Sequence, residues 1–140
     1  MAETANKPGD TPRGTLAIRT VAMPADANAN GDIFGGWVLG QMDIAGGIAA
    51  SERCRGRCAT VAVDAMTFHL PVNVGDVLAA FAEVVKVGRS SMTIRVEAWA
   101  TRRMSGEQVK VTEGTYTYVA IDENRRPRPV DPDTPERMET

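Results

Sequence analysis

The apolar stretch from residue 33 to residue 51, IFGGWVLGQMDIAGGIAAS, constrains the fold more than any other part of the chain. Asp43 carries the only charged side chain within it, and most other positions are small or apolar. A segment that is apolar on nearly every side must be buried rather than laid on a surface. We therefore expect a buried helix that begins at residue 35 or 36 and ends near residue 53.

The same stretch is about long enough to span a bilayer, but its glycines, Gln41 and Asp43 make a poor membrane helix. The first residues, MAETANKPGDTPRG, contain no apolar core with basic flanks, so we expect no signal peptide. The formal net charge of −2 gives no electrostatic reason to expect nucleic acid. The sequence therefore predicts a cytoplasmic protein with neither a membrane nor a nucleic acid as its partner.

Asp43 is the candidate catalytic residue. On a helix, Leu39 and Gly46 lie on the same side as Asp43. A carboxylate among such neighbours loses hydration, which favours its neutral form and raises its basicity. An acid is seldom placed in an apolar environment without a partner, because its transfer from water is costly. One interpretation is a catalytic carboxylate, and the other is a helix acid that reaches solvent or caps another group.

The order of the predicted elements indicates one domain with two irregular ends. Residues 1–13 are expected to be a disordered N-terminal lead, residues 14–122 the folded domain, and residues 123–140 a flexible C-terminal tail rich in Pro and charge. A strand and a structured turn region precede the helix, and four strands follow it, over residues 59–70, 77–87, 92–101 and 109–121. This order predicts an α+β fold in which a curved antiparallel sheet wraps around the central helix.

The cysteines and the single histidine do not suggest a metal site. Cys54 and Cys58 are separated by three residues, which is neither redox-motif nor zinc-site spacing, and His69 is the only histidine. We expect two free thiols in a reducing cytoplasm and no bound metal.

Three segments carry a resemblance to a known family: RTVAMPADANANGDIFGGWVLGQMDIAGG, VAVDAMTFHLPVNVGD and VKVGRSS. In this order and spacing they resemble the hotdog-fold acyl-CoA thioesterases, and in particular the short, broad-specificity bacterial enzymes of the YciA type. The resemblance covers about residues 19–129. It implies the hotdog fold, a five- or six-stranded sheet wrapped on the helix. It also implies homodimers joined through a continuous sheet, often assembled as trimers of dimers.

The resemblance implies hydrolysis of acyl-CoA to free CoA and a carboxylic acid, without a metal or redox cofactor. The family's catalytic acid corresponds to Asp43, which would act as general base or as nucleophile. The backbone N–H groups of Gly35 and Gly36, at the helix N-terminus, would form the oxyanion hole. Asn28 and Asn30 would organise the entrance loop, and Asn28 is a further candidate catalytic residue. The alternative is that both asparagines only form turns.

The family's CoA contact corresponds to a glycine turn with charged and hydroxyl side chains, namely Lys86, Gly88, Arg89, Ser90 and Ser91. Guanidinium and hydroxyl groups suit phosphate oxygens, although an ordinary soluble hairpin would explain the spacing equally well without the resemblance. One departure concerns Leu70, which stands where close relatives often carry Arg or Lys before a proline. If that residue contacts a CoA phosphate, affinity here should be lower or supplied elsewhere. Arg125, Arg126 and Arg128 of the tail could add positive charge near the same nucleotide, but we expect them to be solvated.

Two alternative functions use the same fold. A dehydratase would need a histidine in its site, and His69 is predicted at a strand end. A non-catalytic acyl-CoA sensor should carry a DNA-binding segment or lack the carboxylate, and neither feature is found in these residues. Five large apolar residues could line an acyl tunnel or fill the core: Trp37, Met42, Met66, Phe68 and Phe81.

Overall fold

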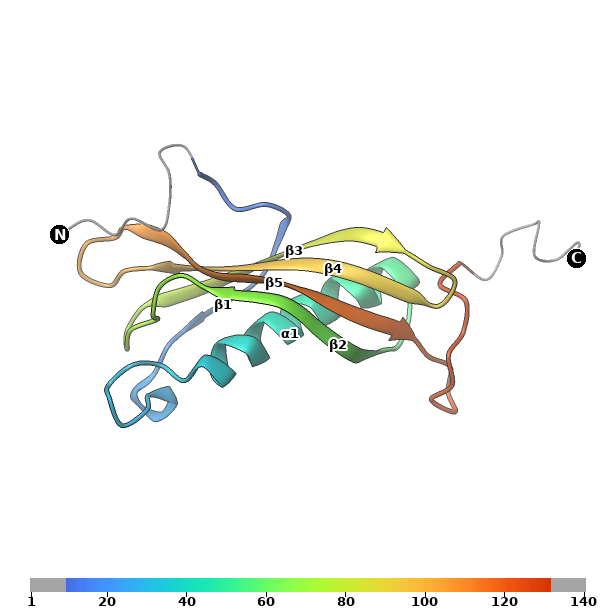
Figure 1. Cartoon of the computed structure of the whole chain (residues 1–140), viewed down its shortest axis with the longest axis horizontal. Coiled ribbons are helices and arrows are strands. Elements are labelled where there is room, and N and C mark those ends of the chain that lie inside the picture. Colours follow the sequence, from blue (N-terminus) through green and yellow to red (C-terminus); the bar gives the residue numbers. More distant parts are fainter. Residues whose placement is uncertain (1–9, 132–140) are drawn as a thin grey trace, which may run out of the picture.

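The structure is a computed structural model that describes residues 10–131. One long helix lies against one face of a five-stranded antiparallel sheet (Figure 1). The elements are β1 (Thr15–Val21), a short 3-10 helix (Pro24–Asp26), α1 (Gly35–Cys54), β2 (Cys58–Phe68), β3 (Val77–Val87), β4 (Ser91–Thr101) and β5 (Gln108–Ala120). The strand order is β1-β3-β4-β5-β2, so β1 and β2 form the two edges of the sheet. The predicted α+β order of elements is confirmed.

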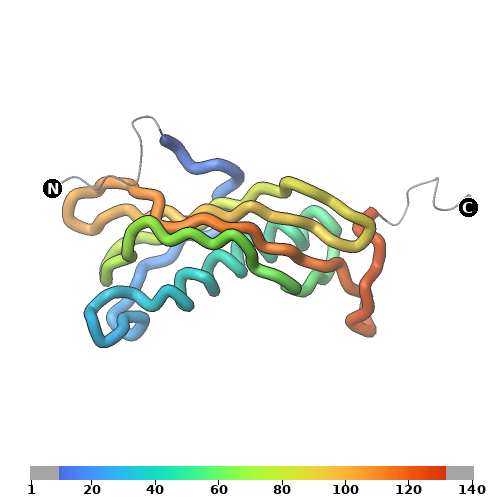
Figure 2. Tube along the Cα trace, in the orientation of Figure 1, coloured from blue at the N-terminus to red at the C-terminus, as the bar shows by residue number. Residues whose placement is uncertain are grey.

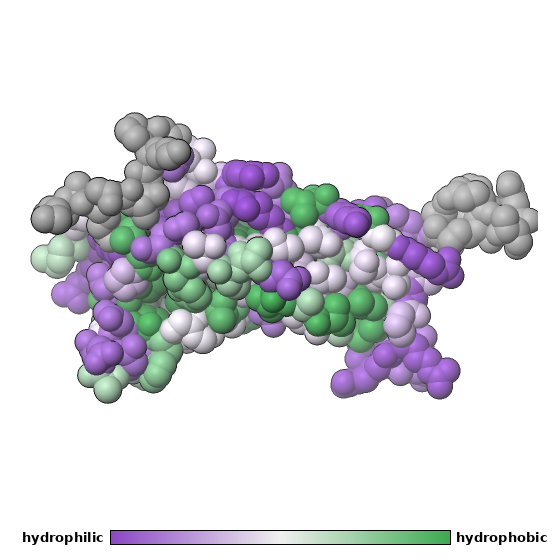
Figure 3. All heavy atoms as spheres, viewed as in Figure 1, coloured by the Kyte–Doolittle hydropathy of each residue, from purple (hydrophilic) through white to green (hydrophobic). Residues whose placement is uncertain are grey.

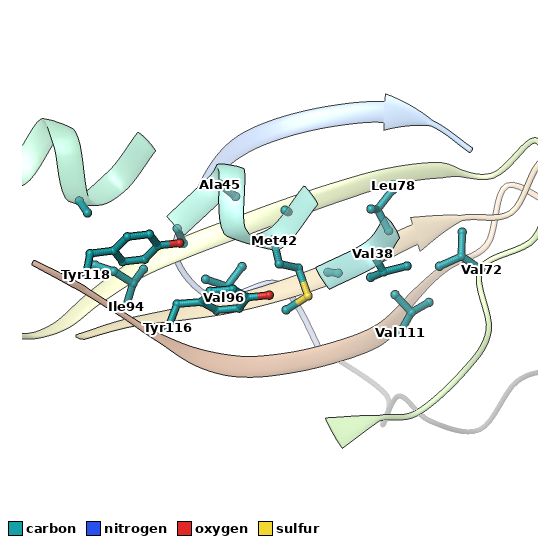
Figure 4. Packing of buried hydrophobic residues seen from close by; sticks show 14 of the residues in the cluster. Val38, Met42, Ala45, Val72, Leu78, Ile94, Val96, Val111, Tyr116 and Tyr118 are labelled. Carbon is teal, nitrogen blue, oxygen red and sulfur yellow. The ribbon is translucent and has the colours of Figure 1, made fainter. Parts of the chain in front are cut away.

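Helix α1 occupies the predicted span and packs one side on the sheet. It ends where Arg55 adopts a left-handed conformation (φ 57°) and its N–H donates to the carbonyl of Ser51. In the core, the buried side of the helix meets β4 and β5, and Met42 points from the helix toward the sheet (Figure 4). The helix runs from the loop that precedes it at one end of the sheet to the β3–β4 turn at the other (Figure 1).

The packing of the sheet on the helix confirms the predicted fold, and within one chain the sheet leaves part of the helix surface exposed. Ile44 and Ile48 of α1 are 53% and 38% exposed, and Val61 and Val63 of edge strand β2 are also exposed. We call these four residues the uncovered apolar face; apolar atoms are visible along β2 in Figure 3. Five strands cover only one side of the helix, so the apolar pattern of the other side requires another covering.

The opposite face of the sheet carries an outer charge cluster, formed by Arg95, Glu97, Glu113, His69 and Lys110. Arg95 bridges both glutamates, while His69 Nε2 lies 2.9 Å from Glu113 Oε2 and Lys110 Nζ lies 3.3 Å from Glu113 Oε1. Burial acts to raise the pKa of Glu113, but hydrogen bonds from His69 and Arg95 outweigh it and lower that pKa to about 2. The cluster is therefore a stabilised set of paired charges.

The cluster reaches the segment before β1 as well. The backbone N–H of Arg13 donates to Glu97 Oε1 at 3.2 Å, and the indole N–H of Trp99 donates to the same oxygen at 3.0 Å. Residue 13 therefore lies against the sheet, although the sequence placed it in the N-terminal lead. Residues 1–9 of that lead lie outside the described residues.

Residues 123–131, which the sequence placed in the tail, lie beside the β3–β4 turn (Figure 2). Val130 is buried, and its N–H donates to the carbonyl of Arg89 at 2.8 Å. Arg128 corrects the expectation of solvated arginines, because its guanidinium donates to the carbonyls of Cys54 at 2.9 Å and Ile121 at 3.2 Å. A cation is favourable at the C-terminal end of a helix. Residues 132–140 lie outside the described part, and the domain boundaries at 13 and 122 stay predictions.

Candidate active site

Asp43 lies in the middle of α1, and its side chain points toward β2 and β5. Its Oδ1 accepts a hydrogen bond from Thr60 Oγ1 at 2.7 Å and one from Tyr118 Oη at 2.9 Å. Its Oδ2 has no partner among residues 10–131, and no described cation pairs with it. Two neutral hydroxyls therefore fix one carboxylate oxygen and leave the other available.

The strand register explains why the two hydroxyls meet at one oxygen. Thr60 of β2 and Tyr118 of β5 are direct cross-strand partners, so their side chains stand side by side on the same face of the sheet. The Tyr118 hydroxyl also donates to the main-chain carbonyl of Asp43 at 2.8 Å. Burial, followed by its hydrogen bond to Asp43, raises the pKa of Tyr118, so the hydroxyl keeps its proton and remains a donor.

Gly46 makes the room that this arrangement needs. A Cβ atom at Gly46 would overlap the hydroxyl of Tyr118, whereas a Cβ at Gly40 would meet nothing within 4 Å. Gly46, Thr60 and Tyr118 were not predicted as site residues from the sequence. In the sequence, the indications of their role are that a glycine stands one helical turn after the acid and that a tyrosine lies on the core face of a strand.

The carboxylate opens into a cleft of about 450 Å³ between α1, β2 and β5. Its wall combines apolar and hydroxyl or thiol side chains, including Ile44, Ile48, Cys58, Thr60 and Tyr118. Cys58 and the buried Cys54 are both free thiols, as predicted. Because Ile44 and Ile48 also belong to the uncovered apolar face, the cleft and that face are continuous.

The helix N-terminus borders a second, smaller cavity of about 230 Å³. Within the described chain, no side chain caps α1, and the N–H groups of Gly35 and Gly36 have no acceptor. Apolar residues form most of the wall: Ile33, Val38, Phe68, Leu70, Pro71, Val72 and Val111. The free N–H groups and the positive end of the helix dipole suit an oxygen that gains negative charge.

Asn28 lines the same cavity and shapes the loop that leads to α1. Its Oδ1 accepts the backbone N–H groups of Asn30 at 2.8 Å and Asp32 at 3.2 Å. Its side-chain nitrogen has no partner in the described part of the chain. Asn28 is therefore a loop-forming residue that still offers a donor, whereas Asn30 contributes a backbone group.

The structure does not bring Asp43 and the two glycine amides together within one chain. Gly35 and Asp43 are about two helical turns apart, which corresponds to about 12 Å along the axis. A base or nucleophile and an oxyanion donor that serve one carbonyl must each lie about 3 Å from its reacting atoms. Within one protomer, the Asp43 cleft and the Gly35 cavity are therefore separate.

The five predicted CoA-binding residues lie at the end of β3, in the β3–β4 turn and at the start of β4. The N–H of Gly88 donates to the carbonyl of Ser91, and the carbonyl of Ser90 accepts the N–H of Ala120, each at 2.8 Å. Lys86 and Arg89 are exposed and have no ion-pair partner among the described residues. Next to Ser91, Met92 pairs with Tyr118, so the turn starts at the level of the sheet where Asp43 is held.

His69 lies in the outer charge cluster and does not line the Asp43 cleft. The site therefore lacks the histidine that a dehydratase would need. In the described chain, no three His, Cys, Asp or Glu side chains are grouped so that they could hold a metal ion. Among residues 10–131, no helix is long and apolar enough to cross a membrane.

Comparison with known proteins gives consistent results. The model of the thioesterase superfamily matches residues 30–107. Acyl-CoA thioester hydrolase YciA of Salmonella typhimurium is 51% identical over 124 residues, which cover 86% of this chain and 93% of that protein.

Two crystal structures are similar to the whole domain. The hexameric thioesterase of Yersinia pestis has 53% sequence identity and a TM-score of 0.82, over 85% of this chain and 97% of that one. A hexameric broad specificity acyl-coenzyme A thioesterase has 45% identity and a TM-score of 0.86, over 97% of this chain and 94% of that one. These neighbours have the arrangement of one long helix on a five-stranded antiparallel sheet that residues 10–131 adopt.

Proposed function

This chain belongs to the thioesterase superfamily, among the YciA-type acyl-CoA thioester hydrolases with the hotdog fold, and we propose that it hydrolyses acyl-CoA to free CoA and a carboxylic acid. The observation that carries the proposal is the state of Asp43. Its carboxylate opens into a cleft, is held at one oxygen by two neutral donors, and keeps the other oxygen available.

Asp43 has two routes to the same products. As a general base, it would take a proton from water while the water oxygen attacks the thioester carbon. As a nucleophile, it would attack that carbon itself and form a mixed anhydride, which water then hydrolyses. In both routes the carbon–sulfur bond breaks and CoA leaves as a thiolate. A thiol has a pKa of about 8.5, so the leaving sulfur needs little help from an acid.

The amides of Gly35 and Gly36 would stabilise the oxyanion, with Asn28 beside them. Because these groups lie about 12 Å from Asp43 in one chain, we propose that each site joins the Asp43 cleft of one protomer to the Gly35 cavity of its partner. The uncovered apolar face would then be the dimer interface, with the two β2 edges paired into a continuous sheet. The hexameric neighbours support a homo-oligomer, and we propose a trimer of dimers.

CoA would be held through its phosphates by the β3–β4 turn. Lys86 and Arg89 supply charge and have no ion-pair partner within residues 10–131, and Ser90 and Ser91 supply hydroxyls. Leu70 lines the cavity beside Gly35, so in this chain that position extends an apolar wall. Phosphate binding would accordingly rest on the turn.

The proposal also includes that no metal or redox cofactor takes part, since the steps above use only the chain's own groups. Activity that survives dialysis against a chelator would support this, and activity lost and then restored by a metal ion would contradict it. The two free thiols agree with the cytoplasmic location that we propose.

The test is release of free thiol from a panel of acyl-CoAs by the wild-type protein and by Asp43→Ala. We expect a loss of about 10²–10⁴-fold in kcat for the variant. Glu107→Gln, which changes an exposed carboxylate in the β4–β5 loop, is the matched control and should keep wild-type turnover. Substantial turnover by Asp43→Ala would remove Asp43 from the mechanism.

A further inference from the structure

We propose that the buried ion pair between Asp76 and Arg102 is a positioning device for the start of α1. The pair fixes the turn at residues 71–76. Backbone contacts from this turn then fix the residues that precede Gly35 and Gly36. The inference rests on the proposed function, because it assigns the pair a role in placing the oxyanion donors.

The pair fixes both ends of that turn. Arg102 Nη1 donates to Asp76 Oδ2 at 2.5 Å and to the carbonyl of Pro71 at 3.0 Å. Asp76 Oδ2 also accepts the backbone N–H of Asn73 at 2.8 Å. The side chains of Asp76 and Arg102 are only 3% and 9% exposed, so water offers these groups little competition.

The turn is bonded directly to the chain that enters α1. The N–H of Ile33 donates to the carbonyl of Val72 at 3.1 Å, and the backbones of Asp32 and Asn73 form an isolated antiparallel β-bridge. Ile33 stands two residues before Gly35, so a shift of the turn would reach the first helical amides. Pro71 and Val72 also line the cavity that contains Gly35 and Asn28.

The end of β1 is attached to the same turn. The N–H of Ala22 donates to the carbonyl of Asp76 at 2.9 Å, and the N–H of Gly75 donates to the carbonyl of Ala22 at 2.8 Å. The turn is therefore bonded to the end of β1 and to Arg102, which follows β4. Its Val72 carbonyl is the group that holds Ile33. An apolar pair of similar volume is often as stable as a buried ion pair, but it lacks these directional bonds.

The outer charge cluster provides a matched control. Arg95 pairs with the buried Glu97 on the opposite face of the sheet, and within residues 10–131 neither side chain has a hydrogen bond or ion pair to the loop before α1. Loss of this pair should affect stability and leave the helix start in place. The two pairs therefore separate a positioning role from a general structural one.

The experiment compares two double variants of the full-length protein, each of which avoids an unpaired buried charge. In Asp76→Asn with Arg102→Met, we expect kcat for acyl-CoA hydrolysis to fall about 10- to 100-fold, because small displacements at a catalytic site have effects of this size. KM should change by less than about threefold. Hydrogen exchange in the peptide that covers residues 27–36 should become faster.

In Glu97→Gln with Arg95→Met, kcat and exchange over residues 27–36 should stay at wild-type values although the melting temperature falls. The single variant Arg102→Lys, which keeps the positive charge, should recover part of the lost kcat. Should the first double variant fail to fold, Arg102→Lys alone carries the test and should show both a reduced kcat and faster exchange.

Equal kcat and equal exchange in the wild type and the Asp76–Arg102 variants would overturn the inference, and so would an equal loss of kcat in both double variants. If the wild-type protein releases no thiol from any acyl-CoA, the proposed function fails. In that case the exchange measurement still reports whether the pair holds residues 27–36, so the two failures are distinguishable.

Discussion

Asp43 and Glu113 are partly buried carboxylates on opposite faces of the same sheet, and their partners differ in kind. Glu113 receives hydrogen bonds from Arg95, Lys110 and His69, which together lower its pKa to about 2. Asp43 receives hydrogen bonds only from the hydroxyls of Thr60 and Tyr118 among residues 10–131.

The difference separates a carboxylate that stabilises from one that can react. Cationic partners neutralise a carboxylate and use its lone pairs, so it contributes to folding and resists protonation. Neutral hydroxyls orient a carboxylate and leave its negative charge in place. Asp43 keeps one oxygen open to a cleft of about 450 Å³, which is what a base or a nucleophile requires.

The largest expected effect tests this contrast directly. Asp43→Asn should lower kcat by about 10²–10⁴-fold with little change in melting temperature, because it removes a base or nucleophile but keeps its shape. Glu113→Gln should do the opposite, with kcat nearly unchanged and stability lower by about 1–3 kcal/mol, since charged partners lose their acceptor. Thiol-release kinetics and thermal unfolding of both variants measure the two effects. The contrast is lost if Glu113→Gln reduces kcat as much as Asp43→Asn.

Gly35→Pro should have the next largest effect, a loss of about 10²–10³-fold in kcat, because it removes one proposed oxyanion donor. The first helical position tolerates proline, and Phe34 already has φ −57° and ψ 134°, which suits a residue before proline. A Cβ at Gly35 would lie 3.6 Å from Phe68, an ordinary contact. The melting temperature of the Gly35→Pro variant should therefore stay close to that of the wild type. Wild-type kcat in this variant would exclude the Gly35 amide from the reaction.

Smaller losses are expected where the support of Asp43 is weakened. Tyr118→Phe removes one of two hydroxyl donors, and we expect a decrease of about tenfold in kcat. Gly46→Ala should act in the same direction, because the new Cβ would displace the Tyr118 hydroxyl. Gly40→Ala is the control, since nothing lies within 4 Å of a Cβ there. If Gly46→Ala and Gly40→Ala have equal kcat values, the role given to Gly46 is wrong.

The smallest effect concerns stability in acid. The pKa of Glu113 is about 2 when folded and near its ordinary value of 4.5 when unfolded, so the folded state gains stability above pH 4.5. That contribution should be lost as the pH falls from about 4.5 to about 2. In denaturant titrations, Glu113→Gln should flatten the pH dependence across this window. An unchanged slope would mean that Glu113 is not the group that titrates.

Local patterns predicted what depends on local sequence. The span of α1 and the selection of Asp43 both follow from neighbours within a few positions along the chain. Thr60 and Tyr118 lie 17 and 75 residues from Asp43, and their alternation is typical of any core-facing strand, so their role required the register of β2 and β5. The pattern indicated that α1 is covered on all sides, but it could not show that one chain leaves Ile44 and Ile48 open.

Composition also misled at two positions of the C-terminal segment, Arg128 and Val130. The stretch after Asp122 is rich in Pro and Arg, which favours a solvated tail. In the structure, Arg128 donates to the carbonyl of Cys54 at the end of α1, and Val130 is buried beneath the β3–β4 turn. Both contacts join segments that are far apart in the sequence, so a local sequence pattern cannot predict them.

We propose that each site takes Asp43 from one protomer and the Gly35 and Gly36 amides from its partner. The most direct test mixes Asp43→Asn and Gly35→Pro subunits in equal amounts, unfolds them together and reassembles them. Because a mixed two-fold dimer would contain one site with both groups intact, thiol release should recover to about one quarter of the wild-type rate. If each protomer instead formed a complete site, no mixed dimer would contain an intact one, and the mixture would stay as inactive as the two variants alone.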